Sequence, residues 1–303
     1  MKTKILRNIL LSLGAGLVAV LAPITAHAQN LYVSLGFPAF AIYEYTPTGV
    51  QSTYASGLPV PRGLAFDGLG DLFAAENPEP DDIDIGRVLK FNLRNHVSTV
   101  GSAANFIFEG LATDMAGNAY VMATDDRSPT AAGTIFKFTP SGERIVFGSV
   151  PTTPNPVLQP FGLAFDSAGN LYAADGSAQT IYKFAPNGAR TVFVGPSAFA
   201  TGVYPVGLAF DSSGNLFVST NDFENPGDDT ILKFTPSAMK STFATGLTAP
   251  RGLAFDASGN LFVAENIDFP GGDILEFAPG GGAPTVFASG LGRPQFLTFG
   301  PPR

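Results

Sequence analysis

The amino-acid sequence predicts an all-β protein, a six-bladed β-propeller with four antiparallel strands in each blade. Three observations lead to this prediction. A five-residue motif recurs at spacings of 47, 52, 45 and 45 residues, which is a period typical of propeller blades. Short apolar runs alternate with turns that contain Gly or Pro, and no long stretch shows helical periodicity. The chain also starts part-way through a repeat that its last residues complete.

Composition narrows the class of protein further. The chain has 303 residues, of which 45% are hydrophobic and 14% are charged, and this balance excludes a disordered chain. It has no Cys, which excludes a disulfide scaffold, a thiolate nucleophile and a zinc–thiolate site.

The first 28 residues read as a signal peptide. Lys2, Lys4 and Arg7 form a basic start, residues 9–22 are apolar, and Ala26-His-Ala28 fits a signal-peptidase site. The apolar run is shorter than the ~20 residues that a membrane-spanning helix needs. We expect cleavage after Ala28, export to the periplasm or the extracellular space, and no membrane span in the mature chain.

The mature surface is predicted to be acidic. Removing residues 1–28 takes three of the 17 basic residues and no acidic residue, so 14 positive charges face 25 negative ones, a formal charge of −11. Nucleic acid is excluded as a partner, because phosphate binding needs clustered Lys and Arg. We expect a monomer, and His96 is the only histidine of residues 29–303.

The repeated motif is Gly-Leu-Ala-Phe-Asp. Its copies are residues 63–67, 110–114, 162–166, 207–211 and 252–256, with a degenerate copy at 296–300. In the five complete copies a Gly follows the Asp by three residues, as Gly259 follows Asp256. An Asp side chain can accept hydrogen bonds from backbone amides two residues on, and Gly takes a positive φ. We interpret this segment as a hairpin turn and not as part of a calcium loop.

The two ends of the chain are predicted to share one blade. Residues 31–34, 41–45 and 52–55 match the second, third and fourth strands of a repeat, and residues 295–299 supply the missing first strand. Residues 29–303 then form one domain of six blades. The predicted blades are 293–300 with 31–57, then 61–103, 106–150, 159–199, 204–247 and 249–291.

The segment from Pro250 to Glu265, PRGLAFDASGNLFVAE, resembles the NHL repeat. More broadly, the chain is similar to the six-bladed propeller superfamily of gluconolactonase-like and strictosidine-synthase-like proteins. The resemblance implies the fold, but it does not single out a function, because this scaffold hosts lactonases, esterases, lyases and binding modules. In gluconolactonase-like relatives a Glu, two Asn and an Asp hold a divalent metal in the channel. Glu109 matches the Glu, whereas Phe161, Val206 and Arg251 stand where the other ligands would be.

We call the face that carries the loops between second and third strands, and between fourth and first strands, the top face. Two rings of residues should surround its mouth. The ring before each motif Gly reads Gln295, Arg62, Glu109, Phe161, Val206, Arg251. The ring at the end of each second strand reads Leu35, Glu76, Ala123, Asp175, Thr220, Glu265. We expect ligand recognition at this face, because its loops are long. The long loops are residues 77–86, 124–133, 151–159, 221–229 and 266–272.

The first ring suggests a ligand site at Arg62, Glu109, Arg251 and Gln295. Arg62 and Arg251 flank Gln295, and two guanidinium groups can bind a carboxylate or phosphate bidentately. The alternative is that each Arg pairs with a neighbouring acid such as Glu76 or Glu265.

The second ring suggests a metal site. Glu76, Asp175 and Glu265 would converge with loop carboxylates to bind Ca²⁺ at the mouth. The alternative is that these acids only keep exposed loops soluble. No other cofactor is predicted.

Two functions follow from these patterns. The first is an exported binding module that uses its top face for a small molecule, a glycan or a protein. The second is a metal-dependent hydrolase related to the gluconolactonases, with an altered metal site. Catalytic residues are unknown, because no nucleophile and base can be paired from the sequence, and His96 falls in a turn on the opposite face.

Overall fold

The structure is a computed structural model. It describes residues 29–77, 85–125, 127, 132–151, 160–222, 225, 227–268 and 270–301, and for residues 160 and 161 only the backbone. The predicted signal peptide, parts of the long top-face loops and the Phe161 side chain lie outside the described residues. Within the described residues, no helix is long and apolar enough to cross a membrane.

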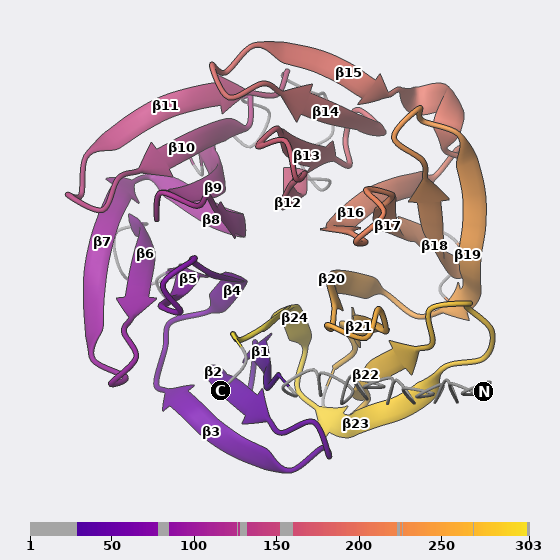
Figure 1. Ribbon diagram of the computed structural model, residues 1–303, viewed down its shortest axis with the longest axis horizontal. Helices are drawn as coiled ribbons and strands as arrows, with labels where there is room; N and C mark the ends of the chain where they lie inside the picture. The colour runs from indigo at the N-terminus through magenta and orange to yellow at the C-terminus, as the bar shows by residue number, and fades with distance from the viewer. Residues whose placement is uncertain are drawn as a thin grey trace, which may run out of the picture.

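The protein is an all-β propeller, whose sheets stand around a common axis (Figure 1). Three sheets follow one another in the second half of the chain. The first of them contains β12 (Pro160–Phe165), β13 (Leu171–Asp175), β14 (Thr180–Phe184) and β15 (Arg190–Val194). After the short 3₁₀ helix Pro196–Ala198 come β16 (Val203–Phe210), β17 (Leu216–Asp222), β18 (Asp229–Phe234) and β19 (Lys240–Leu247). The next sheet contains β20 (Pro250–Phe255), β21 (Leu261–Glu265), β22 (Gly272–Phe277) and β23 (Thr285–Leu291).

One sheet joins the two ends of the chain. It runs in the order β24 (Pro294–Phe299), β1 (Leu31–Leu35), β2 (Ala41–Tyr45) and β3 (Gln51–Ser56). β24 and β1 are antiparallel, with Leu31 opposite Phe299 and Val33 opposite Leu297. The structure thus contains the pairing that the incomplete first repeat predicts, and this pairing covers the edge that β1 would otherwise expose.

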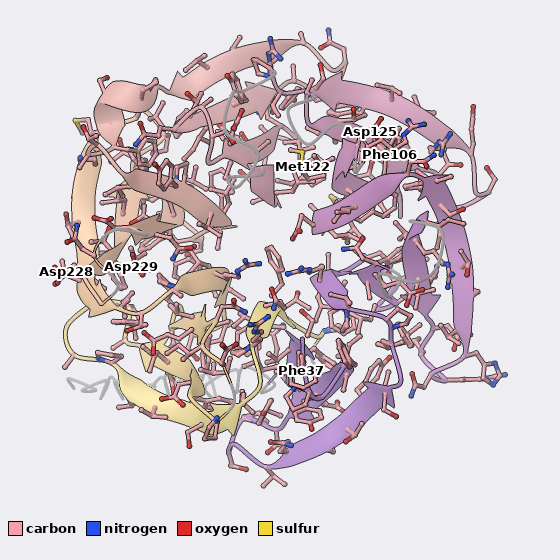
Figure 2. The ribbon with its side chains drawn as sticks, turned by 180° about the vertical axis from the view of Figure 1, so that it is seen from behind. Phe37, Phe106, Met122, Asp125, Asp228 and Asp229 are labelled. Atoms are coloured by element: carbon pink, nitrogen blue, oxygen red, sulfur yellow. The ribbon has the colours of Figure 1, made fainter. Side chains whose placement is uncertain are left out.

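The remaining strands form one eight-stranded sheet, where the sequence predicts two separate blades. Its strands are β4 (Pro61–Phe66), β5 (Leu72–Glu76), β6 (Ile85–Phe91), β7 (Val97–Ala104), β8 (Phe106–Thr113), β9 (Ala119–Asp125), β10 (Thr134–Phe138) and β11 (Arg144–Ser149). A single parallel bridge, Ile85 to Phe106, links the two halves, and Phe106 opens β8 (Figure 2). The physical reason is the short connection, since only Asn105, with a φ of 63°, separates β7 from β8.

The innermost strands β4, β8, β12, β16, β20 and β24 surround the centre of the ring (Figure 1). Each contacts the next in this cyclic order, and β24 contacts β4. The residues that precede the motif glycines are therefore brought to one place near the axis, although they are far apart in sequence.

The hairpins between first and second strands are built as the motif predicts. The Asp211 carboxylate accepts hydrogen bonds from the amides of Ser213 at 3.0 Å and Asn215 at 2.8 Å. Gly214 closes the turn with a φ of 78°. Turn chemistry thus accounts for the recurring Asp and Gly without a metal.

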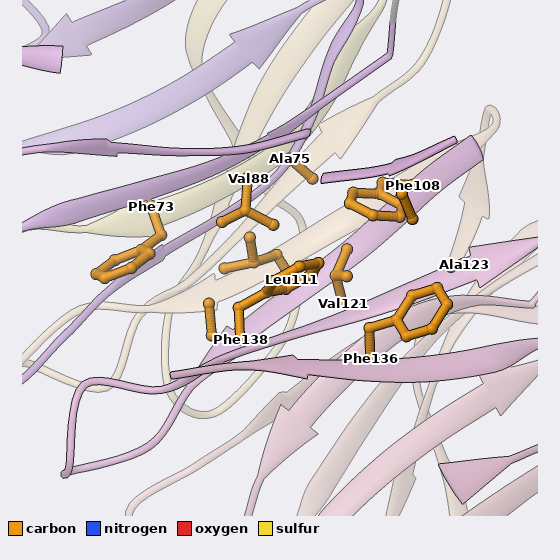
Figure 3. Close-up of a cluster of buried hydrophobic side chains, with 11 residues drawn as sticks. Phe73, Ala75, Val88, Phe108, Leu111, Val121, Ala123, Phe136 and Phe138 are labelled. Atoms are coloured by element: carbon orange, nitrogen blue, oxygen red, sulfur yellow. The ribbon is translucent and has the colours of Figure 1, made fainter. Parts of the chain in front are cut away.

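The core lies between neighbouring sheets. In one cluster, Phe73 and Val88 pack against Phe108, Val121 and Phe138 of the following strands (Figure 3). Elsewhere an aromatic residue of the second strand meets two others, edge to face. Phe217, for example, lies 5.0 Å from Phe243 and 4.9 Å from Phe255 of the next sheet, measured between ring centroids.

The motif glycines lie where inner strands touch. A Cβ atom on Gly207 would come within 1.9 Å of the carbonyl oxygen of Arg251, and one on Gly63 would come within 2.6 Å of the carbonyl oxygen of Glu109. The atoms that such a Cβ would meet belong to the backbone, which cannot move aside as a flexible side chain can. Only glycine therefore fits at these positions without displacing the neighbouring strand.

We expect Gly207→Ala to lower the free energy of unfolding by about 3 kcal/mol, because the added methyl group overlaps backbone of β20. Chemical denaturation measures this change. Gly280→Ala is the matched control, since a Cβ there meets nothing within 4 Å. Equal stability of the two variants would contradict the close approach of the inner strands.

Candidate functional site

Three neighbouring inner strands form the candidate site at the top face. β20, β24 and β4 each begin with Pro, and the next residue is Arg251, Gln295 or Arg62. Because β24 contacts both β20 and β4, these three side chains meet at one level of the ring. We call them the Arg–Gln–Arg cluster.

One oxygen holds the cluster together. The Gln295 side chain is 3% exposed, and its Oε1 accepts a hydrogen bond from Arg62 Nη1 at 2.8 Å and another from Arg251 Nη1 at 2.9 Å. Its Nε2 donates to the carbonyl oxygen of Arg293 at 3.1 Å. The amide oxygen thus marks a position where two guanidinium groups converge, and an anionic oxygen would bind more strongly there.

Glu109 lies beside the cluster on β8. Arg62 Nε and Glu109 Oε2 are 3.8 Å apart, an ion pair without a hydrogen bond, and neither atom has a hydrogen-bond partner among the described residues. Glu109 is 4% exposed. One carboxylate therefore faces two arginines, which leaves a net positive charge in a buried setting.

The charge environment acts on Arg251. Burial is the largest influence and lowers the pKa of Arg251 to about 10, nearby Glu109 raises it, and the positive charges of Arg62 and Arg293 lower it. The guanidinium remains charged at neutral pH. A bound anion would relieve both the burial penalty and the repulsion between the arginines.

A pocket of about 310 Å³ opens onto the cluster. Besides the cluster it is lined by Arg293 and Asn266 and by Phe37 and Phe40 of the loop between β1 and β2. Phe37 is 64% exposed and projects from the sheet that joins the chain ends (Figure 2). Arg293 pairs with Asp268, an exposed acid outside the lining. The pocket combines cationic donors with aromatic surface, which suits a small anion carrying an apolar group.

The structure places the predicted ligand residues Arg62, Glu109, Arg251 and Gln295 together. Glu76 and Glu265, which the sequence suggests as alternative partners of these arginines, have other partners in the structure. Glu76 bonds Arg87 of its own sheet at 3.3 Å, and Glu265 accepts a hydrogen bond from the Thr248 amide at 2.8 Å. Neither acid contacts Arg62 or Arg251 through these bonds.

The predicted metal ligands Glu76, Asp175 and Glu265 end strands β5, β13 and β21, which belong to three different sheets. Burial raises the pKa of each carboxyl. In the part of the chain that the structure describes, no group of three or more His, Cys, Asp or Glu is arranged to hold a metal ion. The loop acids Asp81, Asp82, Asp84, Asp126 and Glu224 lie outside that part, so calcium binding with their help remains a prediction.

Sequence reasoning missed Phe37, Phe40 and Arg293 as lining residues. The loop between β1 and β2 is short, so its length did not single it out as a recognition loop. The two Phe residues in this loop were the signal in the sequence that could have indicated an apolar lining. His96 is exposed in the turn between β6 and β7, away from the cluster, as expected.

Comparison with solved structures shows the propeller fold. Virginiamycin B lyase from Staphylococcus aureus superposes with a TM-score of 0.51 at 17% identity, covering 75% of this chain and 69% of the lyase. TolB from Acinetobacter baumannii gives 0.69 at 10% identity, covering 90% of this chain and 67% of TolB. A candidate gluconolactonase gives 0.53 at 16% identity, covering 80% of this chain and 81% of that one. No family model and no curated protein sequence matches the chain.

Asp175 gives a pH-dependent prediction. It is 1% exposed, and burial raises the pKa of its carboxyl to about 6, although the amides of Ala178 and Ser177 donate to it. The unfolded chain ionises near pH 3.9. The folded state therefore binds more protons between about pH 4 and pH 6, and the free energy of unfolding falls as pH rises through this window.

We expect Asp175→Asn to remove this loss, because Asn keeps an acceptor for the Ala178 amide without a buried charge. The variant should exceed the wild type in unfolding free energy by about 1–3 kcal/mol at pH 8 and match it near pH 4. Urea denaturation at the two pH values measures the difference. A constant offset at both would show that Asp175 does not titrate as described.

Proposed function

We propose that this protein is an exported propeller that binds a small ligand bearing a carboxylate or phosphate at its top face. The observation that carries the proposal is the convergence of Arg62 and Arg251 on one oxygen of Gln295 inside a pocket of about 310 Å³. Bidentate guanidinium pairs are well suited to planar anions. Phe37 and Phe40 would cover an apolar part of the ligand.

We further infer that the ring is a six-bladed propeller of NHL type. Counting β4–β7 and β8–β11 as two blades joined by one bridge gives six groups of four strands. Six inner strands in closed cyclic contact support this count. The basic start and apolar run of residues 1–28 support export.

The structural neighbours support a propeller module in general. By name they include a lyase, a candidate gluconolactonase and TolB, so the fold is compatible with both catalysis and protein binding. The cluster favours binding, because it presents charged donors and, among the described residues, no arranged metal-binding group. The alternative of a metal-dependent hydrolase remains open to assay with lactones and aryl esters, with calcium and then with chelator.

The first test uses benzoate as a probe and the neutral benzamide as its matched control. We expect benzoate to bind and Arg251→Gln to weaken binding at least about tenfold, the effect of losing one charge-assisted hydrogen bond. Isothermal calorimetry measures this. Arg127→Gln removes the same charge from an exposed ion pair with Asp125 and should change affinity less than about twofold. Equal binding of benzoate and benzamide would contradict an anion site.

Gln295→Glu gives a second, independent prediction. A carboxylate would receive two charge-assisted hydrogen bonds from Arg62 and Arg251, whose gain exceeds the loss of the hydrogen bond from Gln295 Nε2 to the Arg293 carbonyl oxygen. We therefore expect the variant to be more stable by about 1 kcal/mol and to have lost benzoate binding. Thermal denaturation and calorimetry measure the two effects. A less stable variant that still binds benzoate would refute the proposed role of the cluster.

A further inference from the structure

A second unusual site lies on the opposite face, where a repeated lysine is replaced by an acid. In four repeats a Lys of the third strand stands opposite an aromatic residue of the second strand. The lysines are Lys90, Lys137, Lys183 and Lys233. At the same place on β22 the chain has Glu276, directly opposite Phe262 of β21.

The four lysines show what this position is built to hold. Each ammonium lies over the aromatic ring, between 5.1 and 5.3 Å from its centroid. In three of the repeats the same ammonium also pairs with the Asp of the hairpin turn, as Lys233 does with Asp211 at 3.7 Å. The ring face and the carboxylate together form a cation site that the chain fills with its own lysine.

The Glu276 repeat keeps this site but lacks the lysine. Asp256 accepts hydrogen bonds from the Ser258 and Asn260 amides at 2.9 and 2.7 Å, the same contacts that Asp211 makes in its repeat. Phe262 is 4% exposed and packs edge to face on Phe287 and Phe299, as Phe217 packs on Phe243 and Phe255 in its repeat. We call Asp256, Phe262 and Glu276 the ammonium cage.

The cage faces a pocket of about 220 Å³. Leu31, Phe287 and Phe299 line its apolar side, and Thr46 and Pro47 of the neighbouring sheet close its rim. The Glu276 carboxylate is half-buried and has no hydrogen-bond or ion-pair partner within the described ranges. The pocket therefore offers a negative end and an apolar wall to a molecule from outside.

The sheet that joins the chain ends shows the contrast. There Glu44 stands opposite Tyr32, but Gly300 replaces the hairpin Asp, and Glu44 accepts hydrogen bonds from Asn30 and from the Tyr32 hydroxyl. An acid at the lysine position thus accepts hydrogen bonds from its own neighbours in one repeat and faces Asp256 in the other.

We propose that the ammonium cage binds a primary alkylammonium group, which takes the place that the repeat's own lysine holds elsewhere. The ammonium would lie over Phe262 between Asp256 and Glu276, and its alkyl chain would run along Phe287 and Phe299. Two carboxylates are too few for a calcium ion, which takes six to eight oxygen ligands, so an organic cation fits better. The group can belong to a free amine or to a lysine side chain of a partner protein. This site is independent of the proposed function at the top face.

The test is an NMR titration of the mature chain with n-butylammonium, following the backbone amides of residues 256–260. We expect saturable shifts at about millimolar concentration, as for partly exposed cation–π and ion-pair contacts, and none with n-butanol at the same concentration. The tripeptide Gly-Lys-Gly with an acetylated N-terminus and an amidated C-terminus, whose one ammonium is that of the lysine, forms the second arm. Tighter binding of the peptide indicates a lysine of a protein partner, and tighter binding of butylammonium indicates a free amine.

Two variants make the test specific. Glu276→Lys supplies the missing lysine, so it should raise the melting temperature and weaken butylammonium binding at least about fivefold. Lys233→Glu should create a second cage at Asp211 and Phe217, with new shifts at residues 211–215. If butylammonium shifts no amide in the wild type, or binds Glu276→Lys equally well, the proposal is wrong. If Lys233→Glu does not fold, the wild type and Glu276→Lys still decide it.

Discussion

The close approach of the innermost strands is the constraint on which the rest of this structure depends. At Gly63, Gly162, Gly207 and Gly252 a Cβ atom would lie between 1.9 and 2.6 Å from backbone of the next inner strand. Such contact fixes the level of each strand relative to its neighbours, because a shift of one residue would place a side chain in the gap. The residues before these glycines are therefore held in a ring, and the Arg–Gln–Arg cluster is one consequence.

Aromatic contacts also hold neighbouring sheets together. The Phe of the repeated motif contacts the aromatic residue on the second strand of the preceding sheet, as Phe165 contacts Tyr120 and Phe210 contacts Tyr172. Each such edge-to-face pair contributes about 0.5–1.5 kcal/mol beyond its buried area. Thr113 replaces this Phe in one copy, and its hydroxyl donates a hydrogen bond to the carbonyl oxygen of Phe66 at 2.7 Å.

Much of the fold could be predicted from sequence because local chemistry repeats. Motif spacing predicts the Asp and Gly of each hairpin and the division of each repeat into four strands. It also predicts the pairing of Phe299 with the first strand of the chain. The site was harder to predict. Spacing brought Arg62 next to Gln295, but it could not show that both arginines share one oxygen or that Arg62 pairs with Glu109, because these contacts depend on side-chain rotamers across separate strands. The bridge at Ile85, which merges two expected blades into one sheet, depends on backbone angles at Asn105.

Departures from the repeat explain why both candidate sites occur where the chain ends meet. Each repeat places similar residues around a given position. A side chain that differs from the repeat pattern therefore lies among residues that normally contact another side chain. Glu276 faces Asp256 at a place formed for an ammonium, and Gln295 lies between two arginines on an inner strand whose motif Gly is replaced by Phe296. The pocket at the ammonium cage lies between the β20–β23 sheet and the sheet made from both chain ends, and the pocket at the Arg–Gln–Arg cluster is lined by these two sheets and by Arg62 of β4. Both pockets are lined by residues of β24, Gln295 in one and Phe299 in the other, so both sites depend on the pairing of β24 with β1 that joins the chain ends.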